Sequence, residues 1–240
     1  MSLLIDAKEG RDVAISDVVG AYLLAEMKDH VIVKLTGIAV DVLCRANNSY
    51  QKFVSLEKGR KVIYLKLERA LYGCIQSALL WYNTFVTKLK KDGFVLNRYD
   101  PCVANKQING SQCTVCWYVD DTKISHLNPN VVTNVIESLE SVFGKMTVDR
   151  GKIHKFVGMN FEILDNGRLK IMMKEYLDEC IESFEEIDGV IVSKALTPGA
   201  HNIFEVDETL DKLCIRKSEM FHHIVAKLLF VTKQARLDVE

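Results

Sequence analysis

The segment CTVCWYVDDTKISH, residues 113–126, constrains the fold of this chain more than any other segment does. Two runs of strand-forming residues flank the adjacent carboxylates Asp120 and Asp121, and side chains of different character alternate along both runs. This pattern predicts strands at 112–119 and 122–126, joined by a tight turn that presents Asp120 at its tip. Adjacent carboxylates repel each other. An ordinary solvated turn and a cation site are therefore the two interpretations of the pair.

A divalent cation would remove this repulsion. Carboxylate oxygens, with substrate phosphates in the remaining positions, are the usual ligands of Mg²⁺ in proteins. A third carboxylate, Asp17, ends an apolar segment and is followed by Gly20, Ala21 and Tyr22. That arrangement also fits an ordinary junction between a strand and a helix. Together with Asp120, Asp17 would supply the two carboxylate arms of a two-metal site.

The rest of the sequence mixes helices with antiparallel hairpins, so the expected fold class is α+β. Helical spacing of apolar residues predicts helices at 77–93, 128–144, 173–186 and 217–235. Ser77 and Asn128 are the expected N-caps of the first two helices, and Gly93 is expected to end the first. Further strands are expected at 12–18, 31–35, 61–67 and 102–106, and a hairpin is expected within 155–173. A turn at Asn109–Gly110 would join the strand at 102–106 to the strand at 112–119, and a turn at Asn166–Gly167 would close the hairpin.

Composition limits the class of protein. The chain has 240 residues, 48% of them hydrophobic, which suffices for a substantial core, and its net charge of −1 argues against coating nucleic acid by bulk charge. Its seven cysteines, an odd number without framework spacing, indicate reduced thiols. No secretory signal or membrane-spanning segment is evident. A soluble intracellular protein without membrane contact is therefore expected.

Several segments, in this order, resemble the palm motifs of copia-type retrotransposon reverse transcriptases. They are SDVVGAYL at 16–23, LERALYGCIQSALLWY at 67–82, YVDD at 118–121 and KFVGMNFEI at 155–163. Segments 196–204 and 221–240 resemble that family's thumb region and the segment just beyond the thumb. The resemblance implies a polymerase-type palm, an antiparallel sheet with packed helices, at 1–165 with the fingers largely missing. A small, helical, thumb-like region with the start of the connection region would occupy 166–240.

The resemblance also implies roles for individual residues. Asp17 and Asp120 would be the essential ligands of two Mg²⁺ or Mn²⁺ ions, Asp121 would complete the acidic pair, and the Val18 carbonyl would be a further ligand. Tyr22 would lie under the sugar of the incoming deoxynucleotide and exclude a 2′-hydroxyl. Gly73 and Gln76 would line the nucleotide and template pocket. Tyr118 and Val119 would lie close to the primer terminus.

The sequence departs from the family pattern in three ways. Little of the Lys- and Arg-rich fingers region precedes Asp17. Ile75, Ala78 and Leu80 stand where the family commonly has Lys, Pro and Arg, so two positive charges near the template are absent. The tail has ARLDVE where the family usually has a TRPDI-like motif before a ribonuclease H domain. Because phosphoryl transfer depends on positive charge around the triphosphate, these departures predict weak activity of this piece alone.

The residues and the resemblance leave two functional hypotheses. The favoured one is an RNA-directed DNA polymerase that extends a primer with deoxynucleotides on an RNA or DNA template. The alternative is a catalytically inactive, truncated retrotransposon remnant that at most binds nucleic acid. The resemblance places the protein in the cytoplasm or in a particle, and the apolar face of the segment 222–235 is an expected surface for self-association. Lys145 and Lys152 both remain candidates for a protonating lysine.

Overall fold

The computed structural model describes residues 1–188, 196, 199, 205, 209 and 211–235. Their contacts define two compact units, one formed by residues 9–151 and the other by residues 1–8 with the chain from 152 onward. The expected division into a palm at 1–165 and a thumb-like region at 166–240 stays a prediction. Parts of the two segments that resemble the thumb lie outside the described residues, namely 197–198, 200–204 and 236–240.

An antiparallel sheet forms the centre of the unit 9–151 and confirms the expected α+β class. Its strands, in spatial order, are β5 (Val95–Leu96), β6 (Val103–Ile108), β7 (Ser111–Tyr118), β8 (Asp121–His126), β1 (Asp12–Asp17) and β9 (Thr147–Arg150). The predicted turn between β6 and β7 is confirmed, with φ of 52° at Asn109 and 79° at Gly110, as a type I′ turn requires. β1 thus lies between two strands that come much later in the chain.

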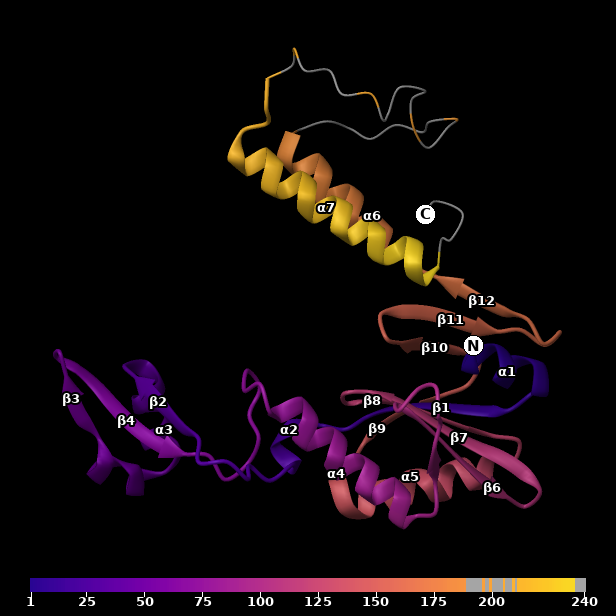
Figure 1. Cartoon of the computed structure of the whole chain (residues 1–240), viewed down its shortest axis with the longest axis horizontal. Coiled ribbons are helices and arrows are strands. Elements are labelled where there is room, and N and C mark those ends of the chain that lie inside the picture. Colours follow the sequence, from indigo (N-terminus) through magenta and orange to yellow (C-terminus); the bar gives the residue numbers. More distant parts are fainter. Residues whose placement is uncertain (189–195, 197–198, 200–204, 206–208, 210, 236–240) are drawn as a thin grey trace. The chain divides into compact units, whose positions relative to one another are not determined.

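Two helices, α4 (Ser77–Lys91) and α5 (Pro129–Phe143), cover one face of this sheet (Figure 1). Their helical periodicity turns apolar side chains toward the strands. The resulting core is rich in aromatic and branched residues, among them Trp81, Phe85, Leu89, Val115, Ile124, Val132, Leu139 and Phe143. This helix layer supports the sheet from behind and leaves the ends of β1 and β8 accessible.

The helix ends agree with the sequence expectations with one exception. Asn128 caps α5, where its side chain accepts a hydrogen bond from the Asn130 N–H at 2.9 Å, and Gly93 comes after α4 with a φ of 85°. The prediction that Ser77 caps α4 is wrong. Its hydroxyl instead donates to the Leu71 carbonyl at 2.7 Å and accepts from the Leu71 N–H at 3.1 Å. The cap position is taken by Gln76.

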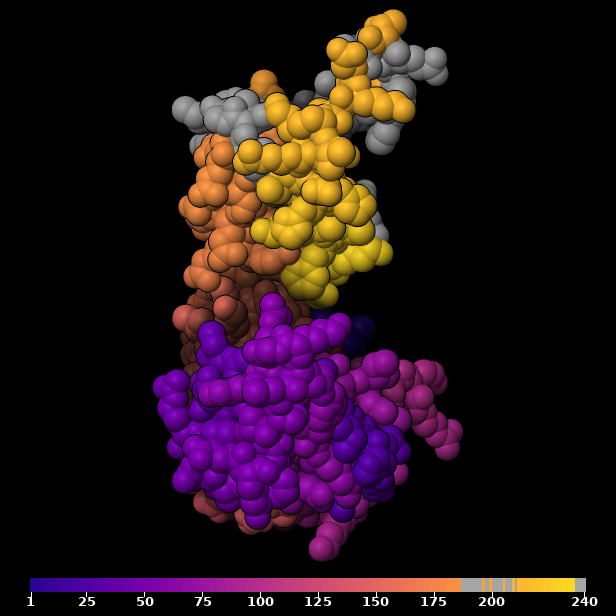
Figure 2. Space-filling model, turned by 90° about the vertical axis from the view of Figure 1, so that its left-hand side faces the viewer, coloured from indigo at the N-terminus to yellow at the C-terminus, as the bar shows by residue number. Residues whose placement is uncertain are grey.

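A second, smaller sheet lies in sequence between β1 and α4, after the short helix α2 (Ala21–Leu24). Its elements are β2 (Ile32–Thr36), α3 (Ile38–Ala46), the 3₁₀ helix η1 (Asn48–Phe53), β3 (Ser55–Glu57) and β4 (Arg60–Lys66), and the strand order is β2-β4-β3. Val40, Val62 and Ile63 form its small buried centre. Figure 2 shows its surface in indigo to violet. The sequence predicted strands near β2 and β4 but missed α3, η1 and β3.

The other unit contains the helix α1 (Ser2–Glu9), except for its last residue, and a three-stranded antiparallel sheet of β10 (Ile153–Phe156), β11 (Met159–Ile163) and β12 (Leu169–Met172). A single hairpin was expected within 155–173, so β10 and the turn before β11 correct that expectation. This turn has φ of 49° at Val157 and 75° at Gly158. Valine disfavours positive φ, so this residue is not a turn signal in sequence.

Helices α6 (Lys174–Asp188) and α7 (Ile215–Gln234) pack against each other in the same unit. The Tyr176 and Phe230 rings lie 5.5 Å apart, and Cys180, Ile224 and Val231 are buried. α7 also has exposed apolar side chains, among them Phe221, Val225, Leu228 and Leu229. Self-association through this helix stays a prediction. Across the described residues, no helix combines the length and the apolar character that crossing a bilayer requires.

Candidate active site

The candidate active site lies where β1 ends and β8 begins. The antiparallel register places Asp17, the last residue of β1, directly opposite Asp121, the first residue of β8. Directly opposite residues point to the same face of a sheet, with Cβ atoms about 4.5–5.5 Å apart. Like charges in such a pair destabilise the sheet. The structure therefore brings together two of the carboxylates that the sequence analysis singled out.

The third carboxylate, Asp120, lies in the two-residue turn between β7 and β8. This turn is tight, as predicted, and its other residue, Val119, has a φ of 59°, as at the first central position of a type II′ turn. The Val18 N–H donates a hydrogen bond to the Asp120 carbonyl at 3.2 Å. The turn is thereby tied to the end of β1, close to Asp17.

The pKa values of two of these carboxylates, Asp17 and Asp121, are raised. Burial raises the pKa of the Asp17 carboxyl, and the charge of Asp120 raises it further. Burial also raises the pKa of the Asp121 carboxyl, with smaller contributions from the charges of Asp120 and Asp17. Each shift means that the ionised form is disfavoured at this site, so a bound cation would be favoured there.

The donor set fits Mg²⁺ bound together with a substrate better than a cation held by protein alone. Within the described residues, no group of three or more His, Cys, Asp or Glu side chains is arranged to hold a metal ion. Mg²⁺ commonly uses one or two carboxylates, completed by water and substrate phosphates. Asp17 and Asp120 meet that requirement. The Val18 carbonyl accepts a hydrogen bond from Ala21 N–H at 3.2 Å, and a carbonyl oxygen has a second lone pair for a cation.

Tyr22 and Tyr72 form an aromatic pair beside the carboxylates. Tyr22 lies in α2, which starts after Gly20 at a φ of 67°, and its ring centroid is 4.5 Å from that of Tyr72. Burial is the main cause that raises the pKa of the Tyr72 hydroxyl, and interactions with Asp120, Tyr22 and Asp17 raise this pKa further. Tyr72 was not among the site residues predicted from the sequence. Its one signal in sequence was the position directly before Gly73 in the segment LYGC.

Two hollows flank the acidic turn. The first has a volume of about 200 Å³ and is mainly aromatic, lined by Tyr22, Ala78, Trp81, Tyr82, Cys102, Trp117, Tyr118 and Val119. The second has a volume of about 270 Å³ and is acidic, lined by Ile15, Ser16, Asp17, Asp121, Thr147, Val148 and Asp149. Three predicted substrate residues, Tyr22, Tyr118 and Val119, therefore share one hollow. Gly73 and Gln76 are exposed just before α4, and their predicted contacts with substrate stay predictions.

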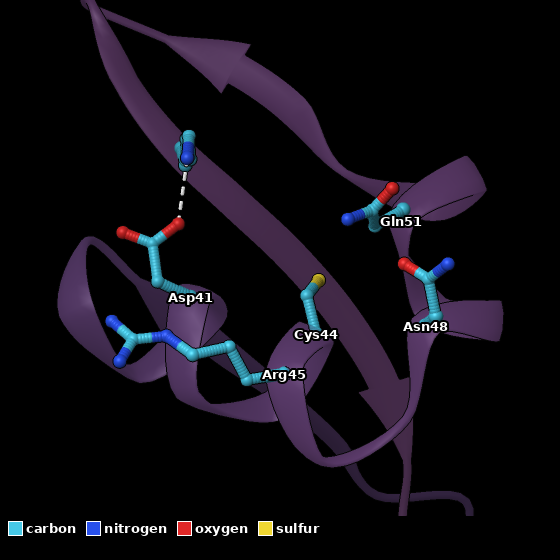
Figure 3. A pocket seen from close by; sticks show the side chains of 6 residues that line it. Asp41, Cys44, Arg45, Asn48 and Gln51 are labelled. Atoms are coloured by element: carbon cyan, nitrogen blue, oxygen red, sulfur yellow. Dashed lines mark hydrogen bonds and ion pairs between the residues drawn. The ribbon is translucent and has the colours of Figure 1, made fainter.

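A larger hollow, of about 490 Å³, lies elsewhere, between α3, η1 and β4 (Figure 3). Its lining is polar and comprises Asp41, Cys44, Arg45, Asn48, Gln51 and Lys61. Lys61 Nζ pairs with Asp41 Oδ1 at 2.6 Å, and both side chains are about half exposed. None of the predicted site residues lines this hollow. We place the candidate active site at the acidic turn because several like charges converge at that turn. In the larger hollow, by contrast, the acid Asp41 already pairs with the base Lys61.

The raised pKa of Asp121 predicts an unusual pH dependence of stability. A raised pKa contributes stability below the ordinary pKa of 3.8, and this contribution is lost as the pH rises through the folded-state value. We therefore expect Asp121→Asn to raise the thermal midpoint of metal-free protein at neutral pH, with a gain that shrinks as the pH falls toward 3.8. Thermal melts with a chelator across this range test it. The exposed Asp211→Asn is the control, and a lower midpoint for Asp121→Asn at neutral pH would contradict the prediction.

The two candidates for a protonating lysine each have an acidic partner. Lys145 Nζ lies 2.8 Å from Glu140 Oε2, and Lys152 Nζ pairs with Asp165 Oδ1. Hydrogen bonding to Glu140 raises the pKa of Lys145. Both side chains are exposed, and neither pair involves the acidic turn. Neither lysine is favoured over the other.

Comparisons with known proteins agree with this geometry. A family model described as reverse transcriptase (RNA-dependent DNA polymerase) matches residues 1–196. A Ty5-1 transposon protein from Saccharomyces cerevisiae is 24% identical over 174 residues, which cover 72% of this chain and 54% of that protein. The retrovirus-related Pol polyprotein from transposon RE1 of Arabidopsis thaliana is 26% identical over 60% of this chain and 10% of its own length. The chain thus spans about half of the first relative and a tenth of the second.

Solved structures give weaker similarity. Apo telomerase from Candida tropicalis matches with a TM-score of 0.40 and 12% identity, over 73% of this chain and 36% of that one. Telomerase from Candida albicans, in complex with a fragment of telomeric RNA, matches with a TM-score of 0.38 and 11% identity, over 77% and 38% of the two chains.

Proposed function

Because this chain belongs to the reverse transcriptase (RNA-dependent DNA polymerase) family, we propose that it extends a primer with deoxynucleotides on an RNA template. Its relatives among transposon Pol polyproteins indicate a copia-type retrotransposon as the source of the domain. The observation that carries the proposal is the placement of Asp17 opposite Asp121, with Asp120 in the adjoining turn. Such a cluster of mutually repelling carboxylates suits cation-dependent transfer to a phosphate substrate.

In this proposal Asp17 and Asp120 hold two divalent cations, with the Val18 carbonyl as a further ligand. When bound, such ions activate the 3′-hydroxyl of the primer and neutralise charge on the triphosphate. Asp121, opposite Asp17 and raised in pKa, adds negative charge that favours cation binding. Tyr118 is 62% exposed beside the aromatic hollow, which suits a side chain that contacts the primer end.

The proposal is tested by primer extension with the purified chain on an RNA template, in the presence of Mg²⁺ or Mn²⁺. Extension that a chelator abolishes is the expected result. The rival hypothesis, an inactive remnant that binds nucleic acid, predicts template-primer binding without any extension. A binding measurement on the same substrate, by fluorescence anisotropy, separates that outcome from a chain that does not bind the nucleic acid at all.

We expect Tyr22→Ala to relax sugar selection. The Tyr22 ring is half-buried, packs 4.5 Å from Tyr72 and lines the aromatic hollow, so removing it opens space at the proposed position of C2′. The expected result is at least about a tenfold gain in ribonucleotide relative to deoxynucleotide incorporation, because a removed steric clash is worth one or more kcal/mol. Single-nucleotide extension with matched dNTP and rNTP measures this ratio. Tyr82→Ala, in the same hollow, is the control, and an unchanged ratio in Tyr22→Ala would refute the assigned role.

A further inference from the structure

The turn that carries Asp120 has an unfavourable backbone. Val119 adopts a φ of 59°, in the left-handed region that glycine or asparagine normally occupies. A β-branched residue in this region is a genuine outlier and persists only where surrounding contacts hold it. The Val119 side chain packs against the apolar core, which gives one such contact. A second contact must fix the peptide itself, because its orientation decides where the Asp120 side chain points.

Trp81 provides that contact. Its indole Nε1–H donates a hydrogen bond to the Val119 carbonyl at 2.6 Å, across 38 positions in sequence. Trp81 is only 2% exposed, and its ring lies 5.2 Å from that of Phe143 and 5.5 Å from that of Phe85. The donor is therefore fixed by the helix layer, and it bonds a carbonyl within the strained turn.

We infer that Trp81 is a positioning residue that holds the Val119–Asp120 turn in its strained form and so keeps the Asp120 carboxylate beside Asp17. A buried tryptophan needs a partner for its N–H in any case, and packing alone explains many such residues. Here the partner is the carbonyl of the residue with positive φ directly before a proposed metal ligand. The catalytic consequence rests on the proposed function, whereas the conformational one does not.

The Val18 N–H reports the state of the turn, since it bonds the Asp120 carbonyl at 3.2 Å. We expect Trp81→Phe to speed native-state hydrogen exchange of this amide about tenfold, as loss of one buried hydrogen bond should do. Trp117→Phe is the matched control. It shrinks the only other tryptophan, in the same core, and leaves the Trp81 bond in place. NMR exchange rates are compared after denaturant melts have set the global stability of each variant.

Val119→Gly supplies the decisive background, because glycine adopts positive φ without strain. In that background, Trp81→Phe should change Val18 exchange by less than about twofold, which is the signature of coupled residues. Equal acceleration in Trp81→Phe and Trp117→Phe, or the same effect of Trp81→Phe in both backgrounds, would overturn the inference. The exchange rates are measured without metal or substrate. They therefore test the inference even if neither the parent chain nor any variant extends a primer.

Primer extension then tests the catalytic consequence. Trp81→Phe should lower kcat about tenfold with little change in the KM for deoxynucleotide, since the bond acts on the turn and not on the substrate. A raised KM with unchanged kcat would show that Trp81 acts through the aromatic hollow and would overturn the positioning role. Absence of extension in the parent chain would instead count against the proposed function alone, because the exchange results would decide the inference.

Discussion

Replacing Asp120 with asparagine is expected to abolish metal-dependent primer extension while leaving the fold intact. The substitution keeps the shape of the side chain but removes the charge at the tip of the turn. Asp17 would then face a divalent cation with one carboxylate arm fewer. A metal ligand of this kind supports several kcal/mol of transition-state stabilisation, so its loss should lower the extension rate at least about a thousandfold.

The controls for this variant separate chemistry from folding. Asp120 contributes to the raised pKa of both Asp17 and Asp121, so its neutralisation removes repulsion and should not lower the thermal midpoint. Asp211→Asn, an exposed acid just before α7, should leave the extension rate unchanged. Extension by Asp120→Asn above about a tenth of the parent rate would count against the assigned role, because a metal-ligand loss should cost far more.

The second large effect is expected on stability. Phe85 is fully buried in α4, and its ring lies 5.2 Å from that of Trp117 and 5.7 Å from that of Phe143. Phe85→Ala removes the centre of this aromatic cluster. It should lower the free energy of unfolding by about 3–5 kcal/mol, through lost apolar burial and the cavity left behind. Urea denaturation followed by circular dichroism measures the change.

Tyr99→Ala is the control for this substitution, because Tyr99 is 97% exposed. Surface changes of this kind usually stay within about 0.5 kcal/mol. A cost below about 1 kcal/mol for Phe85→Ala would mean that the core collapses around the deletion or that the helix layer is not tightly packed. Either result would also weaken the case for a fixed Trp81 donor, since Phe85 packs against Trp81.

Local features of the sequence predicted local structure well. The β7–β8 turn, the I′ turn at Asn109–Gly110 and the cap at Asn128 depend on residues adjacent in sequence, and all three are confirmed. Helix α3 was missed because it is short and comes directly after Gly37, which offers no side-chain cap. The capping role of Ser77 was wrong because a hydroxyl can bond any nearby backbone, here that of Leu71.

The candidate site combines local features with contacts between distant parts of the chain. The acidic pair at Asp120 and Asp121 is visible in sequence, and Asp17 was proposed as its partner on chemistry and on resemblance. Its register opposite Asp121 is a pairing between distant strands, which alternation of side chains alone does not determine. The roles of Tyr72 and Trp81 depend on contacts across the fold, with 38 positions between Trp81 and Val119. No local pattern signals such contacts.

The strand order has a consequence for how the chain acquires its site. β1 lies between β8 and β9, and its Ser16 hydroxyl bonds the Thr122 carbonyl, 106 residues away. Neighbouring hairpins such as β6–β7–β8 close short loops and can form early, whereas β1 must wait for both of its partners. During synthesis from the N-terminus, Asp17 therefore emerges long before Asp121. We expect the carboxylates to converge only late in sheet assembly, so that nascent or truncated chains lacking β8 do not bring Asp17 and Asp121 together.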